Sequence, residues 1–211
     1  HPSSKYEEAM RERLAELAGQ GNDASGVKLD DITPEADGDT LKYRYLTLAV
    51  NRGEREATVI ITGPQASDAR IPDDPASLGA SWYALRMWRE LRHALLELRF
   101  NYPEVGLITF HTKGDSAHVL ALDEAVLAPS ARDHWFVREV LLQQRRTLKM
   151  IDVTARTFFA IITPGSCFAG SLFEIALASD RVYMLDDPDE DNYIALSTAN
   201  DGAFPMAHGL S

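Results

Sequence analysis

Residues 156–184 read RTFFAIITPGSCFAGSLFEIALASDRVYM, and this stretch decides the fold class. It opens with a nearly continuous apolar run over residues 156–163, which predicts a strand covered on both faces, as in a parallel sheet. Small residues then form a turn, followed by a short helix over 172–179 and a second strand over 181–185. This order of elements predicts a βα unit and parallel strand pairing.

Elements on either side of this stretch extend the pattern. Apolar residues at helical spacing predict helices, and runs rich in Val, Ile, Tyr and Thr predict strands. We expect helices over 5–18, 81–100 and 133–151, and we expect Ser81 and Asp133 to be the N-caps of the last two. We expect a hairpin of strands 41–50 and 56–62, further strands over 105–111 and 193–196, and a short extended piece over 119–122. Strands and helices alternate after residue 80, which predicts an α/β protein whose mostly parallel sheet is flanked by helices.

Three segments are expected along the chain. Residues 1–19 form a helix that ends a preceding domain, because a lone amphipathic helix has little to pack against. Residues 20–40 are rich in Gly, Asn and Asp and poor in apolar residues, which predicts a linker. Residues 41–211 form the α/β domain. No helix is expected after its last strand, so the C-terminal part of this domain is expected to be missing.

The composition is globular and excludes several classes of protein. Hydrophobic residues make up 45% and charged residues 25%, and no apolar run is long enough to cross a membrane. Residues 1–12 are charged and have no apolar core, so we do not expect them to act as a secretory signal. A net charge of −11 argues against nucleic acid as a partner, because phosphate binding needs concentrated Lys and Arg. The single cysteine, Cys167, fits a reducing compartment, so we expect a cytoplasmic location.

The turn before the short helix is the strongest candidate for a chemical site. Free backbone N–H groups at a helix start near Gly170 can hold an anion or a developing oxyanion. Glu174 lies in the first turn of that helix and faces whatever occupies the turn. The alternative is purely structural, because many α/β proteins carry a small-residue turn after a strand.

Nucleophilic catalysis and metal binding have weaker support. Ser166 and Cys167 can act as nucleophiles on a sharp turn, but nothing marks His111, His118 or His134 as the base that such a mechanism needs. The alternative for Cys167 is a packed, unreactive thiol. The six histidines show no paired spacing, so no metal site is expected.

Several motifs carry a resemblance to a known family. The stretch from Phe159 to Met184 resembles the crotonase (enoyl-CoA hydratase/isomerase) superfamily, in which a strand and a Gly-rich turn precede a glutamate, Leu-Ala-x-x-Asp and another strand. Residues 79–91 (GASWYALRMWREL), 133–153 (DHWFVREVLLQQRRTLKMIDV) and 164–170 (PGSCFAG) are similar to the C-terminal half of ring-opening lyases in this superfamily, whose chain holds two crotonase-like halves. The resemblance covers essentially the whole chain and implies an incomplete ClpP/crotonase spiral of ββα units, with residues 1–19 ending the first half.

The resemblance also implies an oxyanion hole, in which two backbone N–H groups hold a CoA thioester carbonyl and stabilise an enolate-like charge. It places one donor at Ser171, directly after Gly170, and the other near Leu122. It places the two acids at Glu174 and Thr198. Thr198 is a departure, because a threonine cannot do the acid–base work of a carboxylate near neutral pH. Leu172 is another, because we expect its side chain close to the path of the thioester.

Three functions stay open. The first is a segment of a lyase that opens the ring of an epoxidised or dihydrodiol benzoyl-CoA in aerobic benzoate catabolism, releasing formate and an aldehyde-bearing acyl-CoA. The second is a catalytically silent half that supports the preceding, active half of the same protein. The third is a generic enoyl-CoA hydratase or isomerase, against which the missing second acid counts. The resemblance implies an aromatic acyl-CoA substrate, no cofactor beyond the CoA of that substrate, and a homo-oligomer.

Overall fold

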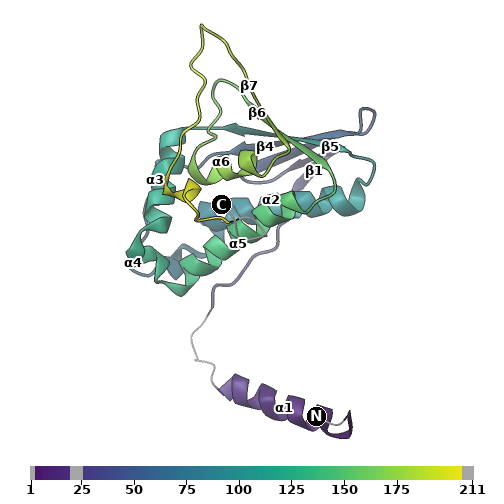
Figure 1. Ribbon diagram of the computed structural model, residues 1–211, viewed down its shortest axis with the longest axis vertical. Coiled ribbons are helices and arrows are strands. Elements are labelled where there is room, and N and C mark those ends of the chain that lie inside the picture. The colour runs from purple at the N-terminus through teal and green to yellow at the C-terminus, as the bar shows by residue number, and fades with distance from the viewer. Residues whose placement is uncertain (1–2, 20–25, 206–211) are drawn as a thin grey trace.

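A computed structural model describes residues 3–19 and 26–205 of the chain (Figure 1). Its helices and strands form one α/β body, with a separate helix at the N-terminus. The strands are β1 (Glu35–Asp37), β2 (Thr40–Lys42), β3 (Leu46–Asn51), β4 (Glu56–Thr62), β5 (Leu107–Lys113), β6 (Thr157–Ile162) and β7 (Arg181–Met184). The helices are α1 (Ser3–Gly19), α2 (Tyr83–Asn101), α3 (Ser116–Leu127), α4 (Pro129–Arg132), α5 (Trp135–Asp152) and α6 (Gly170–Leu177), with 3₁₀ turns η1 (Ala66–Ala69), η2 (Pro75–Ser81) and η3 (Thr198–Asn200).

The seven strands form one mixed sheet in the order β1-β2-β3-β4-β5-β6-β7. Strands β1 to β4 pair antiparallel, and β4 to β7 pair parallel. The α/β class is therefore confirmed, and every strand after residue 80 joins the sheet through parallel pairs, as expected. The expected hairpin is also confirmed, as β3 and β4, but the sheet begins at Glu35, inside the segment predicted to be a linker.

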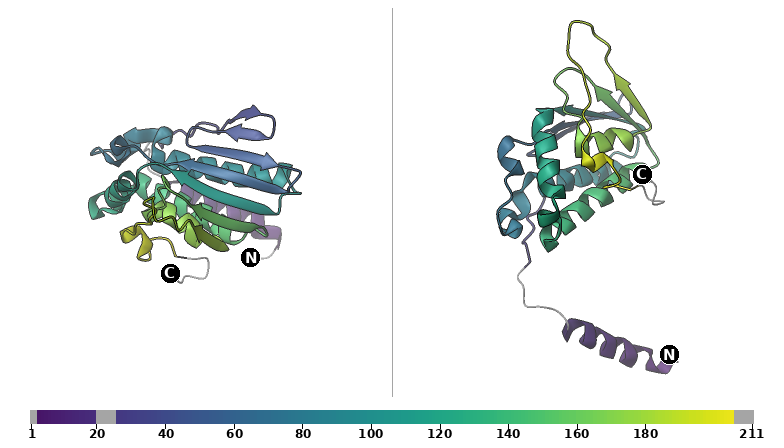
Figure 2. Two further views of the ribbon diagram at one scale, coloured as in Figure 1. Left: turned by 90° about the horizontal axis from the view of Figure 1, so that it is seen from above. Right: turned by 60° about the vertical axis from the view of Figure 1, so that its left-hand side comes forward.

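Among the described residues, helices cover only one face of the sheet. In Figure 1, α2, α5 and α6 lie on the same side of the strands, and Figure 2 (left) shows the strands from the other side. Burial along β6 follows this arrangement, because Phe158, Ala160 and Ile162 are buried whereas Phe159 and Ile161 are half-buried. The prediction that this strand is covered on both faces is therefore wrong.

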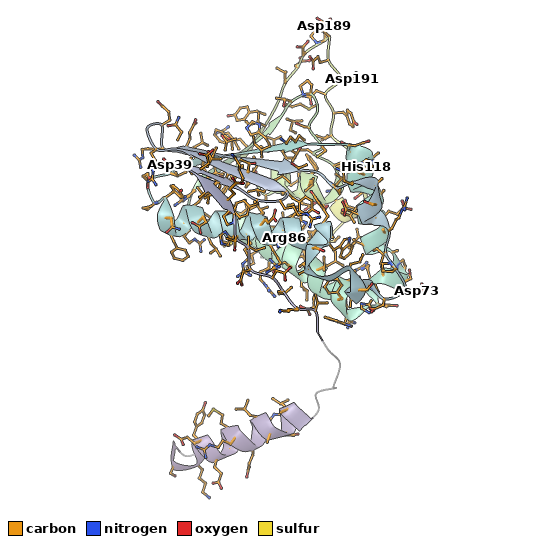
Figure 3. The ribbon with its side chains drawn as sticks, turned by 180° about the vertical axis from the view of Figure 1, so that it is seen from behind. Asp39, Asp73, Arg86, His118, Asp189 and Asp191 are labelled. Atoms are coloured by element: carbon orange, nitrogen blue, oxygen red, sulfur yellow. The ribbon has the colours of Figure 1, made fainter. Side chains whose placement is uncertain are left out.

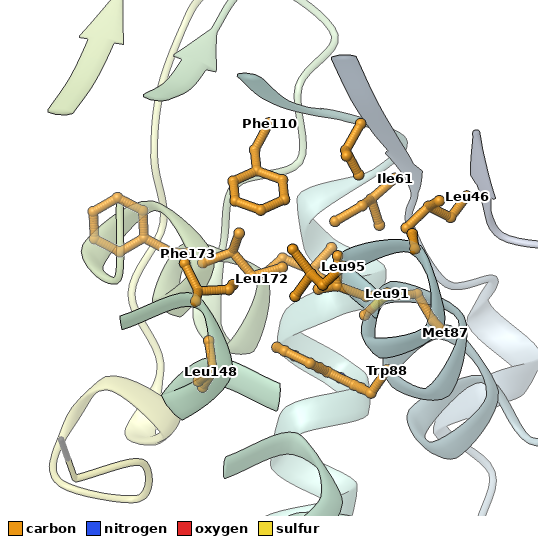
Figure 4. Close-up of a cluster of buried hydrophobic side chains, with 14 of the residues drawn as sticks. Leu46, Ile61, Met87, Trp88, Leu91, Leu95, Phe110, Leu148, Leu172 and Phe173 are labelled. Atoms are coloured by element: carbon orange, nitrogen blue, oxygen red, sulfur yellow. The ribbon is translucent and has the colours of Figure 1, made fainter. Parts of the chain in front are cut away.

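The core lies between the sheet and the two long helices, and Figure 4 shows part of it. The α2 side chains at the predicted helical spacing (Leu85, Trp88, Leu91, Leu95 and Leu98) are all buried there. Burying one such side chain contributes about 1.5–3 kcal/mol, so this face of α2 anchors the fold. On the same helix, the buried Glu90 carboxylate accepts from the Tyr45 N–H and pairs with Arg86, which Figure 3 labels.

Helix starts and one short element differ from the predictions. Trp82 and His134 occupy the N-caps of α2 and α5, one residue after the expected Ser81 and Asp133. Residues 119–122 are not extended but lie inside α3. Asp115 caps that helix by accepting from the Ala117 N–H. Residues 193–196 form only an isolated bridge, at Ala195, rather than a strand.

Two features project from the α/β body. Helix α1 lies apart from it in Figure 1, and its apolar residues Met10, Leu14 and Leu17 are exposed. The acidic loop 186–191 is exposed, and Figure 3 shows Asp189 and Asp191 near its tip. No helix in the described ranges combines the length and the apolar character needed to cross a bilayer.

Candidate functional site

The turn between β6 and α6 is closed by its own hydrogen bonds. The Ser166 N–H donates to the Thr163 carbonyl (2.9 Å), and the Thr163 N–H donates to Ser166 Oγ (3.1 Å). The Cys167 N–H donates to Thr112 Oγ1 on the neighbouring strand β5 (2.9 Å). Three of the backbone donors in this turn are therefore already bonded within the protein.

The Ser171 N–H, expected to be an oxyanion donor, bonds to a carboxylate. It donates to Asp123 Oδ2 at 2.6 Å, and Ser197 Oγ donates to the same oxygen at 3.3 Å. Asp123 lies on α3 and is only 5% exposed. The carboxylate therefore occupies the position in which a thioester oxygen would have to sit to use this donor.

Gly170 makes this close approach possible. Its φ is +43°, and a Cβ added at this position would lie 1.9 Å from Asp123 Oδ2. Its N–H donates to the Ala195 carbonyl at 2.9 Å. A glycine is thus required at the helix start because the Asp123 carboxylate leaves no room for a side chain there. The backbone N–H groups of residues 170 and 171 are both hydrogen-bonded within the protein.

The Asp123 carboxyl is held in a poorly solvated place. Its pKa is raised from 3.8 to about 6, mainly by burial and to a smaller extent by the nearby charge of Glu174. Hydrogen bonds from Ser171 and Ser197 act in the opposite direction, because they stabilise the carboxylate. Asp123 therefore changes charge close to neutral pH, where most aspartates are fully ionised.

Glu174 lies on the next turn of α6 and faces a different space. Asn200 Nδ2 donates both to Glu174 Oε1 (2.6 Å) and to the Gly170 carbonyl (2.9 Å), which ties η3 to α6. Burial raises the pKa of the half-buried Glu174 carboxyl, and the Asn200 hydrogen bond opposes this rise. The residue also lines a pocket of about 290 Å³, together with Leu148, Lys149, Asp152, Asn200, Phe204 and others from α5, α6 and the segment after η3.

The structure brings together only part of the predicted set. Gly170, Ser171 and Glu174 share the start of α6. Leu122 is buried in the middle of α3, where helical geometry directs its N–H toward the preceding turn of the same helix. Thr198 is exposed at the start of η3, and the Leu172 side chain is buried in the core beside Phe173 (Figure 4) rather than near the turn.

Two residues of the site were not recognised in the sequence. Asp123 directly follows Leu122, and Asn200 follows Thr198 by two positions, so both lie close to residues to which the resemblance assigns a role. The sequence feature that could have pointed to Asp123 is its position directly after Leu122, an expected oxyanion donor. Its contact with Ser171 spans 48 positions of the sequence, and local pattern does not reveal such a pairing.

The nucleophile hypothesis finds no support among the described residues. Cys167 is fully buried, and burial raises the pKa of its thiol. His134 accepts from the Phe136 N–H and lies 3.6 Å from Asp74, and His118 lies 3.9 Å from Asp115. Within the described part of the chain, no histidine bonds to Ser166 or Cys167, and no group of three or more His, Cys, Asp or Glu side chains could hold a metal ion.

We expect Cys167 to react at least about 100-fold more slowly with a thiol-specific disulfide reagent in the folded chain than in urea, because the nucleophilic thiolate is both buried and disfavoured. Absorbance of the released thiolate measures both rates. Similar rates in the two states would contradict the buried, structural assignment of this cysteine.

Comparison with known proteins adds one informative relative. No family model matches the chain. A curated protein of Aromatoleum evansii is 40% identical to it over 208 residues. The chain resembles a benzoyl-CoA-dihydrodiol lyase. The match covers 99% of this chain but only 37% of that lyase, and it confirms the resemblance inferred from residues 79–91, 133–153 and 164–170.

Solved structures with a similar arrangement are enoyl-CoA hydratases. One, from Geobacillus kaustophilus, has a TM-score of 0.48 and 20% identity, over 77% of this chain and 53% of its own. Another, an enoyl-CoA hydratase/isomerase from Marinobacter aquaeolei, has a TM-score of 0.41 and 14% identity, over 65% of this chain and 47% of its own.

Proposed function

We propose that this chain is the catalytically silent half of a cytoplasmic carbon–carbon lyase that opens the ring of an aromatic acyl-CoA thioester. The activity of the whole protein is inferred from the benzoyl-CoA-dihydrodiol lyase that resembles 99% of this chain. The silence of this half is inferred from one contact, the 2.6 Å hydrogen bond from the Ser171 N–H to Asp123.

An occupied donor cannot stabilise a reaction intermediate. An oxyanion hole works when preorganised donors point at the place where negative charge develops. Here a carboxylate already fills that place, and its own charge would repel an enolate. The other expected donor, Leu122, lies within α3, and the expected second acid is the exposed Thr198. The corner of Gly170, Ser171 and Asp123 therefore supports a structural role.

One observation favours a second candidate function, a working acid–base site at Glu174. This carboxyl lines a pocket of about 290 Å³, and burial raises its pKa, as is typical of general acids. Asn200, however, occupies one of its oxygens, and no second carboxylate bonds to it within the described ranges. We therefore rank a residual catalytic role below the silent one.

An exposed apolar edge supports the role of this half as a partner for the other. Strand β7 is the last strand of the sheet, and its far edge has no partner within the described residues. Val182, Tyr183, Met184 and Leu185 are all between 44% and 49% exposed. Clustered exposed apolar side chains mark interaction surfaces, so we place the contact with the active half at this edge.

Glu174→Gln in the full-length protein tests this proposal. We expect kcat/KM for an epoxidised benzoyl-CoA to change less than about threefold, because a silent carboxyl contributes little to the transition state. The corresponding substitution in the other half should abolish most of the activity. The purified 211-residue chain alone should release no formate.

The matched control is Asp152→Asn, a carboxyl that lines the same pocket but lies on α5. A loss of about 100-fold or more with Glu174→Gln, at unchanged melting temperature and with Asp152→Asn unaffected, would contradict the silent role. It would establish the acid–base function instead.

A further inference from the structure

A second concave site lies on the helical side of the molecule, between α2 and α5. It has a volume of about 520 Å³ and is also lined by side chains of segment 27–32. That volume is typical of pockets for small molecules. The pocket faces a different side of α5 from the Glu174 pocket, and the two share no lining residue. We call it the α2–α5 groove.

Three arginines line the α2–α5 groove: Arg89, Arg92 and Arg146. None of them forms an ion pair with another described residue, whereas the neighbouring Arg86 pairs with Glu90 at 2.6 Å. Three guanidinium groups without an ion pair among the described residues are unusual in one concavity of a chain with a net charge of −11. They make the groove a local site for negative charge.

Arg89 is the most confined of the three. Its Nη2 donates to the Asp30 carbonyl at 2.6 Å, which ties segment 27–32 to α2. Its Nη1 is shielded from solvent and has no hydrogen-bond partner among the described residues. An unpaired, shielded guanidinium N–H is unfavourable. The groove therefore adjoins a guanidinium N–H that lacks an acceptor.

The remaining wall of the groove is apolar and includes an aromatic ring. Leu85, Phe136 and Val140 are buried along it, and Trp135, at 40% exposure, presents part of its indole. Tryptophan offers a flat face on which aromatic rings stack. Its position at the start of α5, on the groove that Arg146 lines from the same helix, suits a ligand with a ring at one end and an anionic group at the other.

Fewer carboxylates than arginines line the groove. Glu139 lines it and is exposed, and Asp30, Asp31 and Glu90 act on Arg89 from nearby. Glu90 is already paired with Arg86, and Asp30 and Asp31 are exposed to solvent, which screens them. The lining itself thus carries three arginines against one glutamate.

We propose that the α2–α5 groove binds a small aromatic oxyanion. The arginines hold its phosphate or carboxylate group through charge-assisted hydrogen bonds, and Trp135 stacks on its ring. This site is independent of the corner at Ser171 and of the lyase reaction proposed above.

Four probes test the proposal on the 211-residue chain by isothermal titration calorimetry: phenyl phosphate, benzoate, inorganic phosphate and benzyl alcohol. At least one of the first two should bind with a dissociation constant below about 1 mM. The last two, which lack either the ring or the charge, should bind at least about tenfold more weakly. Tighter binding of phenyl phosphate assigns a phosphate ester, tighter binding of benzoate assigns a carboxylate, and either supports the proposal.

Variants locate the site. Arg89→Gln and Arg146→Gln should each weaken binding about tenfold, because a charged hydrogen bond is lost. Arg138→Gln is the matched control, since it removes the same charge from the same helix outside the groove, and should have no effect. Arg146 is exposed, so its variant should stay folded even if the Arg89 variant does not. Absence of binding by both aromatic anions, equal binding of benzyl alcohol or of inorganic phosphate, or an equal loss with Arg138→Gln would overturn the proposal.

Discussion

Gly170→Ala is expected to lower the free energy of unfolding by about 3 kcal/mol. The added Cβ would lie 1.9 Å from Asp123 Oδ2, and the backbone keeps a positive φ of 43°. Overpacking a buried site costs about 1–3 kcal/mol, and a left-handed conformation costs a residue with a Cβ about 1–2 kcal/mol. Urea denaturation followed by circular dichroism measures the loss.

Gly165→Ala is the matched control for this substitution. Gly165 also has a positive φ, of 80°, but no atom lies within 4 Å of the Cβ that alanine would add. We expect a loss of about 1 kcal/mol, from the backbone conformation alone. Equal losses at the two positions would show that Asp123 does not approach residue 170 as closely as the account requires.

Asp123 is expected to make the chain less stable as the pH rises from about 4 to 7.5. Its folded-state pKa, raised by burial to about 6, lies above the unfolded value of 3.8, so the folded chain holds this proton more tightly. Stability is therefore lost as the pH rises through this window, and the loss is complete above the folded-state pKa. At 1.36 kcal/mol for each pKa unit, Asp123 accounts for roughly 2 kcal/mol of the decrease.

Asp123→Asn separates this effect from the other acidic groups. An asparagine keeps the shape of the side chain and can still accept from the Ser171 N–H, but it does not titrate. Urea denaturation of both proteins across this pH range should give a shallower dependence for the variant. Parallel curves would rule out a raised pKa at Asp123. Glu174→Gln should leave most of the slope in place, because Asp123 remains.

Local sequence pattern predicts the elements that build the scaffold. Leu85, Trp88 and Leu91 repeat at helical spacing and all face the core. The hairpin of β3 and β4 follows from two runs rich in Tyr, Thr, Val and Ile on either side of a turn at residues 51–53. Local pattern does not predict structure correctly where a helix cap, or the packing of other elements onto a strand, determines the outcome. Asp115 caps the start of α3, and this helix includes residues 119–122, which were predicted to form a strand-like segment. Strand β6 is apolar on both faces, although helices cover only one of them.

For the candidate site, too, the local sequence predicts one part and tertiary packing decides the other. Gly170, Ser171 and Glu174 lie within five consecutive residues, so sequence alone places them together at a helix start. Whether their amides are free depends on a residue from another helix. The Asp123 carboxylate enters because α3 packs beside α6, and this packing, rather than the turn, decides between an active centre and a structural corner.

An amide NMR titration of the isotope-labelled chain with benzoyl-CoA tests whether the start of α6 is a closed structural corner. The signals of Gly170 and Ser171 report whether a thioester oxygen reaches the two donors, which here bond to Ala195 and Asp123. Because both donors keep their bonds within the protein, we expect that neither signal moves as the ligand is added. Saturable shifts of both signals would contradict this expectation, because they would show that the donors release the protein's own groups and bind the substrate.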